Sequence, residues 1–124
     1  MKLITKAIMA DFEKHKNDKD TGNPWIVCKF FNPCGGFTWY ATEFDQENGI
    51  ITNYMTGGDF DEWGSIFLSD LEKPLPPLGL PCERDLHFKP CFFNDLKTQG
   101  IIKERVYYWP GRGVIAPRHT PRHI

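Results

Sequence analysis

The densest cluster of chemically active side chains follows a proline-rich stretch, where Glu83, Arg84, Asp85 and His87 lie close together in the sequence. Carboxylates and an imidazole are the groups of general acid–base catalysis, and an arginine can bind a phosphate. If residues 84–88 form a strand, Glu83, Asp85 and His87 share one face, because neighbouring side chains alternate. The alternative role is structural: Glu83 or Arg84 holds the proline-rich crossing by ion pairs or backbone hydrogen bonds. The residue types alone leave both roles open.

A second set is acidic and consists of Asp59, Asp61 and Glu62, to which Glu43 and Asp45 can be added. Carboxylate oxygens are ligands for divalent cations, but the D-x-D at Asp59 and Asp61 lacks the rest of an EF-hand loop. We therefore expect a solvated acidic rim. Such a rim can also imitate the phosphate charges of a nucleic acid, and this is a hypothesis about an inhibitor of a DNA-binding enzyme.

The cysteines invite a metal interpretation, since Cys82, His87 and Cys91 form C-x4-H-x3-C, and Cys28 and Cys34 are separated by five residues. Structural zinc sites usually pair ligands two to four residues apart, and Cys28 lies among apolar neighbours. We predict buried or free thiols and no metal, although the spacing leaves open whether the four cysteines are free thiols or ligands. The sequence contains no nucleophile elbow, P-loop or dinucleotide fingerprint, so we predict no catalytic residue and no cofactor.

Rings and guanidinium groups are interleaved near the end of the chain. From residue 101 onward, five Lys and Arg face one Glu, although the whole chain has a net charge of -1. Rings can stack on bases and cations can hold phosphates, so this segment can bind single-stranded nucleic acid. The alternative is that the rings belong to the core or to a docking strand. The residues concerned are Tyr107, Tyr108, Trp109, Arg112, Arg118 and Arg122.

These residues must be positioned by a small fold. A chain of 124 residues with 15% aromatic residues is long enough for one domain with its own core. Thr5 is a candidate N-cap for a helix whose apolar side holds Ile4, Ile8, Met9 and Phe12. Ser69 is a candidate cap for a single helical turn over residues 70–72. A helix over residues 92–99 would end at Gly100.

Segments rich in β-branched and aromatic residues predict strands at 25–31, 37–44, 50–55, 63–68, 84–88 and 101–109. Alternation over residues 37–44 places Phe37, Trp39, Ala41 and Glu43 on one face and Thr38, Tyr40, Thr42 and Phe44 on the other. The prolines at 74–81 predict an extended, non-helical crossing. Short turns between the strands favour an α+β fold, with an antiparallel sheet of about five strands covered by one or two short helices. We predict one domain over residues 1–109 and a flexible basic tail over 110–124.

Several blocks of sequence resemble the bacterial family called domain of unknown function 2958. A K-F-F-x-P segment falls at residues 29–33, T-W-Y-x-x-E-F-D at 38–45, and a variant of S-L-x-E-L-E at 65–72. The most specific block is P-L-G-L-P-x-E-R-D-L-x-F at 77–88. The resemblance covers most of residues 1–90 and not the segment 101–124. It implies a small protein of a plasmid, conjugative element or phage, and no established activity.

Our leading functional hypothesis is a non-catalytic binding protein of a mobile genetic element, acting as an inhibitor of a host defence nuclease, such as an anti-restriction or anti-CRISPR protein. The alternatives are a nucleic-acid-binding module that uses the C-terminal segment, and a small enzyme centred on Glu83, Asp85 and His87. A protein partner is expected in the first case. No segment approaches the ~18 apolar residues of a membrane span, so we predict a cytoplasmic protein without membrane contact.

Overall fold

The computed structural model describes residues 1–17, 22–58 and 61–102, together with the backbone of 107–109 and 113–115. Its helices are α1 (Lys6–Lys14), α2 (Leu68–Leu71) and α3 (Phe93–Thr98). Its strands are β1 (Trp25–Ile26), β2 (Cys28–Phe31), β3 (Thr38–Asp45), β4 (Ile50–Thr56), β5 (Glu62–Phe67), β6 (Glu83–Arg84), β7 (Cys91–Phe92), β8 (Tyr107–Trp109) and β9 (Gly113–Ile115). None of the helices in these ranges is long and apolar enough to span a bilayer.

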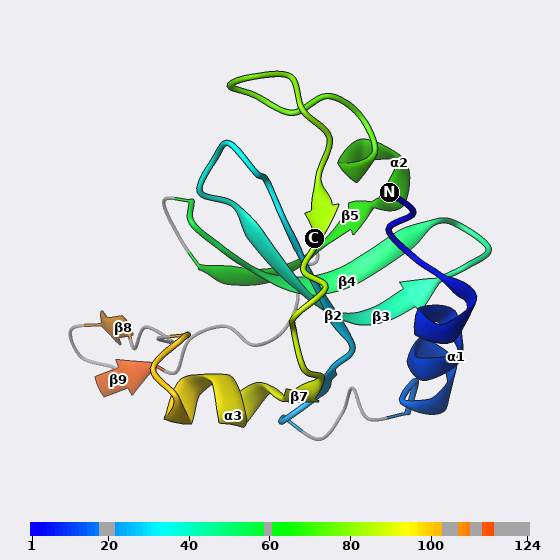
Figure 1. Ribbon diagram of the computed structural model, residues 1–124. Helices are drawn as coiled ribbons and strands as arrows, with labels where there is room; N and C mark the ends of the chain where they lie inside the picture. Colours follow the sequence, from blue (N-terminus) through cyan, green and yellow to red (C-terminus); the bar gives the residue numbers. More distant parts are fainter. Residues whose placement is uncertain (18–21, 59–60, 103–106, 110–112, 116–124) are drawn as a thin grey trace.

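The central element is a five-stranded antiparallel sheet with the order β5-β4-β3-β2-β6 (Figure 1). This confirms the predicted α+β fold. The sheet is antiparallel because β2, β3, β4 and β5 follow one another through short turns, the connection that such pairing needs. Two further pairs, β1 with β7 and β8 with β9, form separate two-stranded ladders.

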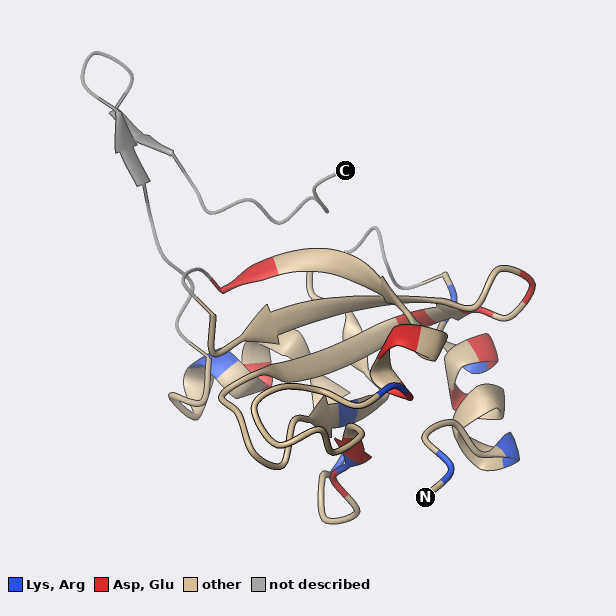
Figure 2. Cartoon of the chain, turned by 90° about the horizontal axis from the view of Figure 1, so that it is seen from above, with Lys and Arg blue, Asp and Glu red and all other residues tan. Residues whose placement is uncertain are grey.

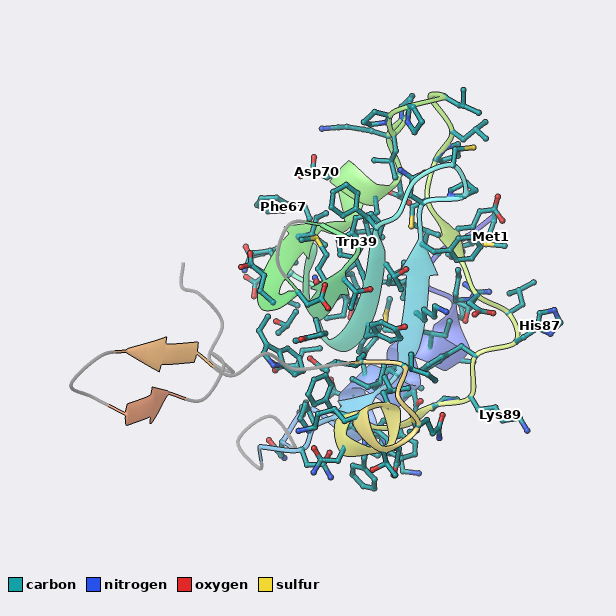
Figure 3. The ribbon with its side chains drawn as sticks, turned by 90° about the vertical axis from the view of Figure 1, so that its left-hand side faces the viewer. Met1, Trp39, Phe67, Asp70, His87 and Lys89 are labelled. Atoms are coloured by element: carbon teal, nitrogen blue, oxygen red, sulfur yellow. The ribbon has the colours of Figure 1, made fainter. Side chains whose placement is uncertain are left out.

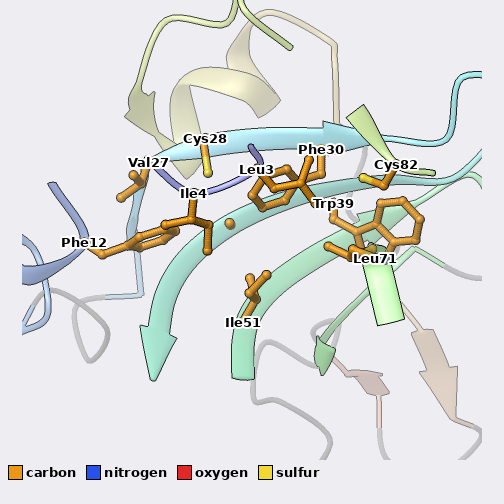
Figure 4. Close-up of a cluster of buried hydrophobic side chains, with 11 residues drawn as sticks. Leu3, Ile4, Phe12, Val27, Cys28, Phe30, Trp39, Ile51, Leu71 and Cys82 are labelled. Atoms are coloured by element: carbon orange, nitrogen blue, oxygen red, sulfur yellow. The ribbon is translucent and has the colours of Figure 1, made fainter. Parts of the chain in front are cut away.

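Each face of the sheet supports a cluster of buried side chains. One face carries the larger cluster, which α1 and the N-terminal segment cover (Figure 4). The other face carries a mainly aromatic cluster that α3 covers, in which the ring of Phe93 lies 4.9 Å from Tyr54 and 4.8 Å from Trp63. Rings at such separations stabilise a core beyond the area they bury.

The first helix forms as its sequence predicts. Thr5 is its N-cap, and the Thr5 hydroxyl accepts a hydrogen bond from the backbone N–H of Ile8 at 3.2 Å. Phe12 is buried in the larger cluster, and Ile8 and Met9 pack against it. The capping bond and the apolar side together explain why the helix begins at Lys6.

The strand predicted at 25–31 is wrong as a single element, because it is divided at Val27. The N–H of Val27 donates to Ala41 O at 2.8 Å, while Trp25 and Ile26 turn away to pair with β7. The first part of this segment therefore belongs to a second ladder, and only Cys28–Phe31 joins the sheet.

The predicted faces of β3 hold only as far as Ala41. The register with β4 shifts between Ala41 and Glu43, which marks a β-bulge at Thr42. A bulge adds one residue and reverses the alternation that follows it. Phe44 therefore lies on the same face as Trp39, where it packs on the larger cluster, and the prediction that placed it opposite is wrong.

Three other expectations need correction. The helical turn predicted at 70–72 begins earlier, at Leu68, and Ser69 lies inside it rather than capping it. The strand predicted at 84–88 is only Glu83–Arg84. Of the strand predicted over 101–109, residues 101 and 102 are not in a strand, 107–109 form β8, which pairs with β9, and 103–106 lie outside the described residues. The helix predicted at 92–99 is confirmed as α3, and Gly100 after it has the positive φ of 75° that a helix C-terminus favours.

Candidate functional site

The structure does not place Glu83, Asp85 and His87 on one face of a strand, as the sequence predicted. After β6 the chain leaves the sheet, so strand alternation does not extend to His87. The Asp85 carboxylate accepts a hydrogen bond from the backbone N–H of His87 at 2.8 Å and lies 3.4 Å from the Lys29 ammonium. The hydrogen bond from His87 lowers the pKa of Asp85 most, and the positive charge of Lys29 lowers it further. Glu83 is exposed, and the imidazole of His87 projects outward at the edge of the molecule (Figure 3).

Arg84 has a structural contact instead. Its guanidinium donates to the backbone carbonyls of Lys2 at 2.5 Å and Leu3 at 2.7 Å. The Leu3 and Ile4 side chains next to these carbonyls are buried in the larger cluster. Arg84 therefore ties the N-terminal segment to the edge of the sheet. The predicted structural role, backbone hydrogen bonds from Arg84, is confirmed, but the prediction that these bonds hold the proline-rich crossing is wrong, because they go to the N-terminal segment.

The proline-rich crossing is held by Asn32, a residue that the sequence analysis did not single out. The buried Asn32 amide donates to Pro76 O at 2.7 Å, and its side-chain oxygen accepts from the Cys34 N–H at 3.0 Å. An asparagine before a proline turn is a common side-chain cap of that turn, which is the signal available in the sequence. The amide fixes the crossing against the β2–β3 turn.

The crossing doubles back, whereas the prediction was an extended segment. Leu75 and Leu80 form an isolated antiparallel bridge, with Leu75 N–H donating to Leu80 O at 2.9 Å. Gly79 N–H also donates to Leu75 O at 2.8 Å, which closes the loop. We call residues 74–81 the proline loop; it projects beyond the sheet (Figure 1).

The proline loop presents an apolar surface. It contains no charged residue (Figure 2). Every residue in it except Leu75 is exposed. Leu78 is 70% exposed and Leu80 is 43% exposed. Single exposed leucines are ordinary, but a continuous uncharged stretch is typical of an interaction site. The sequence does contain a signal for this, since an apolar run interrupted by prolines cannot enter a sheet ladder.

A groove of about 530 Å³ lies between α1 and the segment 84–90. Its lining includes four charged residues, Asp11, Lys14, Arg84 and Asp85, among apolar side chains such as Ile8 and Leu86. Three of them have a partner within the chain: Asp11 has His15 at 3.7 Å, Arg84 has the N-terminal carbonyls and Asp85 has Lys29. The groove therefore offers no set of charged groups converging on a ligand.

The acidic set is divided between two ends of the sheet. Asp45 pairs with Ile50 at one end of β4, and Glu62 pairs with Met55 near the other. Five residues of strand separate these positions by about 17 Å. The Asp45 carboxylate accepts hydrogen bonds from Asn48 and Glu47, which lower the pKa of Asp45.

Asp61 lies directly before β5, and Asp59 lies outside the described residues. Within the described ranges, no three His, Cys, Asp or Glu side chains are grouped so that they can hold a metal ion.

All four cysteines are free thiols in the structure. Burial raises the pKa of Cys28 and of Cys82 to about 12. Burial likewise raises the pKa of the half-buried Cys91. A buried thiol with a raised pKa is a poor nucleophile and behaves as a small apolar side chain.

The basic aromatic segment is described only in part. Tyr107, Tyr108 and Trp109 form β8, which makes a hairpin with β9. Arg112, Arg118 and Arg122 lie outside the described residues. The predicted nucleic-acid interface therefore stays a prediction.

Comparison with known proteins gives one match. A family model described as a protein of unknown function, DUF2958, matches residues 2–93, which include the whole proline loop. No curated protein and no solved structure matches the chain.

Proposed function

Because this chain belongs to the DUF2958 family, whose description assigns no activity, we propose from its surface that it is a non-catalytic binding protein that docks another protein on the proline loop. The observation that carries the proposal is the exposure of Leu78 and Leu80 on a loop without charged residues. Burying each leucine on a partner would remove apolar surface from water, which stabilises the complex by about 25 cal/mol for each Å² buried. Neither side chain contributes to the two buried clusters.

The anchoring of the proline loop supports this proposal. The Asn32 amide donates to the Pro76 carbonyl of the loop, and the Leu75–Leu80 bridge closes the loop. Just after the loop, Cys82 N–H donates to Leu71 O at 3.2 Å. A loop fixed before binding loses less conformational entropy when a partner docks, which favours affinity.

The finer hypothesis is that the chain comes from a mobile element and that the partner is a host defence nuclease. It is supported by the family resemblance and by the lack of a catalytic arrangement in the described part of the chain. The apolar docking loop is compatible with any protein partner. This part of the proposal depends on the identity of the captured protein.

The experiment compares three forms of the tagged chain in a lysate of the source cells. The double variant Leu78→Ser/Leu80→Ser removes the apolar surface of the proline loop. The matched control is Leu86→Ser, since Leu86 is 66% exposed and lies outside the loop. We expect the wild-type chain and the control to capture the same stoichiometric partner, identified by mass spectrometry. The double variant should capture at least tenfold less of this partner.

Two results would overturn the proposal. One is recovery of the bare wild-type chain under several salt conditions. The other is equal capture by the double variant, which would assign binding to another surface. Exposed leucines contribute little to folding, so the melting temperatures of all three forms should agree within about 2 °C.

A further inference from the structure

Among the described residues, no strand pairs with the outer edge of β5. This strand ends the sheet order β5-β4-β3-β2-β6, and among the described residues it is hydrogen-bonded only to β4. Natural edge strands usually carry prolines, bulges or several charges that prevent pairing with another chain. β5 has the sequence EWGSIF, with no proline and a single charged residue, and its register with β4 shows no bulge.

The register with β4 decides which backbone groups face outward. Leu68 N–H donates to Gly49 O at 2.8 Å, and the pairing continues with Ile66 opposite Ile51. Hydrogen-bonding direction alternates along an antiparallel strand, so the even-numbered residues of β5 bond to β4. The N–H and C=O groups of Trp63 and Ser65 and the N–H of Phe67 therefore point to the free edge, whereas the C=O of Phe67, the N-cap of α2, begins that helix.

The side chains of β5 have two complementary features. On one face, Trp63 lies opposite Tyr54 in the aromatic cluster, and Phe67 on the same face is 51% exposed (Figure 3). On the other face, the position of a Cβ on Gly64 has no atom within 4 Å. One face thus offers an uncovered ring, and the other offers an open space over a glycine.

We propose that a second copy of this chain pairs antiparallel with β5, about a two-fold axis at Ser65. In this register Ser65 lies opposite Ser65 of the second copy, Trp63 opposite Phe67, and Gly64 opposite Ile66. The outward N–H and C=O groups of residues 63 and 65 and the outward N–H of residue 67 are then paired. Shifting the register by two residues either way leaves the outward groups of residue 63 or 67 unpaired.

The side-chain pairs in this register explain why the occupant is a second copy. The exposed ring of Phe67 packs beside Trp63 of the other copy, an aromatic cross-strand pair that stabilises a sheet. The Ile66 side chain of one copy extends over Gly64 of the other copy, and so covers a position of that strand that has no side chain. Both contacts occur twice because the axis repeats them.

The residues of this surface, 62–67, are not part of the proline loop, residues 74–81. Dimerisation therefore does not rest on the proposed function. The variant Leu78→Ser/Leu80→Ser should dimerise like the wild-type chain, which separates the two proposals.

The test is sedimentation equilibrium of the full chain over a hundredfold range of concentration. We expect a reversible dimer for the wild-type chain and for Ser65→Ala, which keeps the backbone N–H. Ser65→Pro removes that N–H from the centre of the interface and should weaken dimerisation at least tenfold. A proline is tolerated there in the monomer, because the N–H faces outward on an edge strand.

A cross-link provides a second readout that does not depend on the proline variant. Ser65→Cys places two thiols opposite each other at the axis, and mild oxidation by dissolved oxygen should join them, with peptide mapping locating the disulfide at position 65. The wild-type chain treated in the same way controls for Cys34 and Cys91. A wild-type chain that is monomeric at every concentration would overturn the proposal, as would a Ser65→Pro dimer as tight as the wild-type one.

Discussion

Replacing Arg84 by methionine tests whether this residue holds the N-terminal segment. Methionine keeps most of the aliphatic side chain but removes both hydrogen bonds to the Lys2 and Leu3 carbonyls. A hydrogen bond from a charged group contributes about 1.5–3 kcal/mol when its acceptor is shielded from water. The Leu3 bond is partly buried and should contribute about 1.5–2 kcal/mol, whereas the exposed Lys2 carbonyl can bind water and should contribute less than about 1 kcal/mol.

We therefore expect Arg84→Met to lower the free energy of unfolding by about 1.5–3 kcal/mol. For a chain of 124 residues this corresponds to a melting temperature roughly 5–15 °C lower. Arg84→Lys can still reach one carbonyl and should lose about half as much. Because Leu3 and Ile4 remain in the core, the segment should loosen rather than detach.

The assay is chemical unfolding followed by tryptophan fluorescence, with Lys89→Met as the matched control. Lys89 is an exposed cation on the same stretch of chain, and its replacement should change the free energy by less than about 0.5 kcal/mol. If Arg84→Met is no more destabilising than this control, the two carbonyl contacts contribute nothing and the structural role is wrong. Arg84 would then again be a candidate for binding a ligand.

Three further predictions concern charge, thiols and turns. The pKa of Asp85 is lowered in the folded chain, so its contribution to stability is present above the ordinary value of 3.8 and is lost as the pH falls further. The difference in unfolding free energy between the wild-type chain and Asp85→Asn should therefore be largest at pH 7 and shrink below pH 3.8. A difference that stays constant with pH would contradict this. At pH 8 the native chain should resist alkylation at Cys28 and Cys82, whose pKa values burial raises to about 12, and mass spectrometry should find both modified only after unfolding. Gly57→Ala should lower the melting temperature more than Gly49→Ala does. Both positions have positive φ, but a Cβ at Gly57 would also overlap the backbone oxygen of Gly36 in the neighbouring turn. An equal decrease for the two variants would refute this close approach.

The candidate site was only partly predictable. The polar block at 83–87 is conspicuous in the sequence, and one of the two open roles for Arg84, a backbone contact, is what the structure contains. What the sequence did not indicate is the target, because Arg84 and Leu3 are 81 positions apart. Strand alternation for Asp85 and His87 failed because the edge strand ends at Arg84.

Local features of this protein follow from its sequence alone: the cap at Thr5, the positions of β3, β4 and β5, and the glycine that ends α3. Each depends on hydrogen bonds or periodicities within a few residues, so the information is contiguous. The bulge at Thr42, the division of the chain at Val27, and the bond from Arg84 to Leu3 O are known only from the tertiary structure. Those depend on which distant segments compete for the same backbone groups and the same buried space, and no short stretch of residues records the outcome.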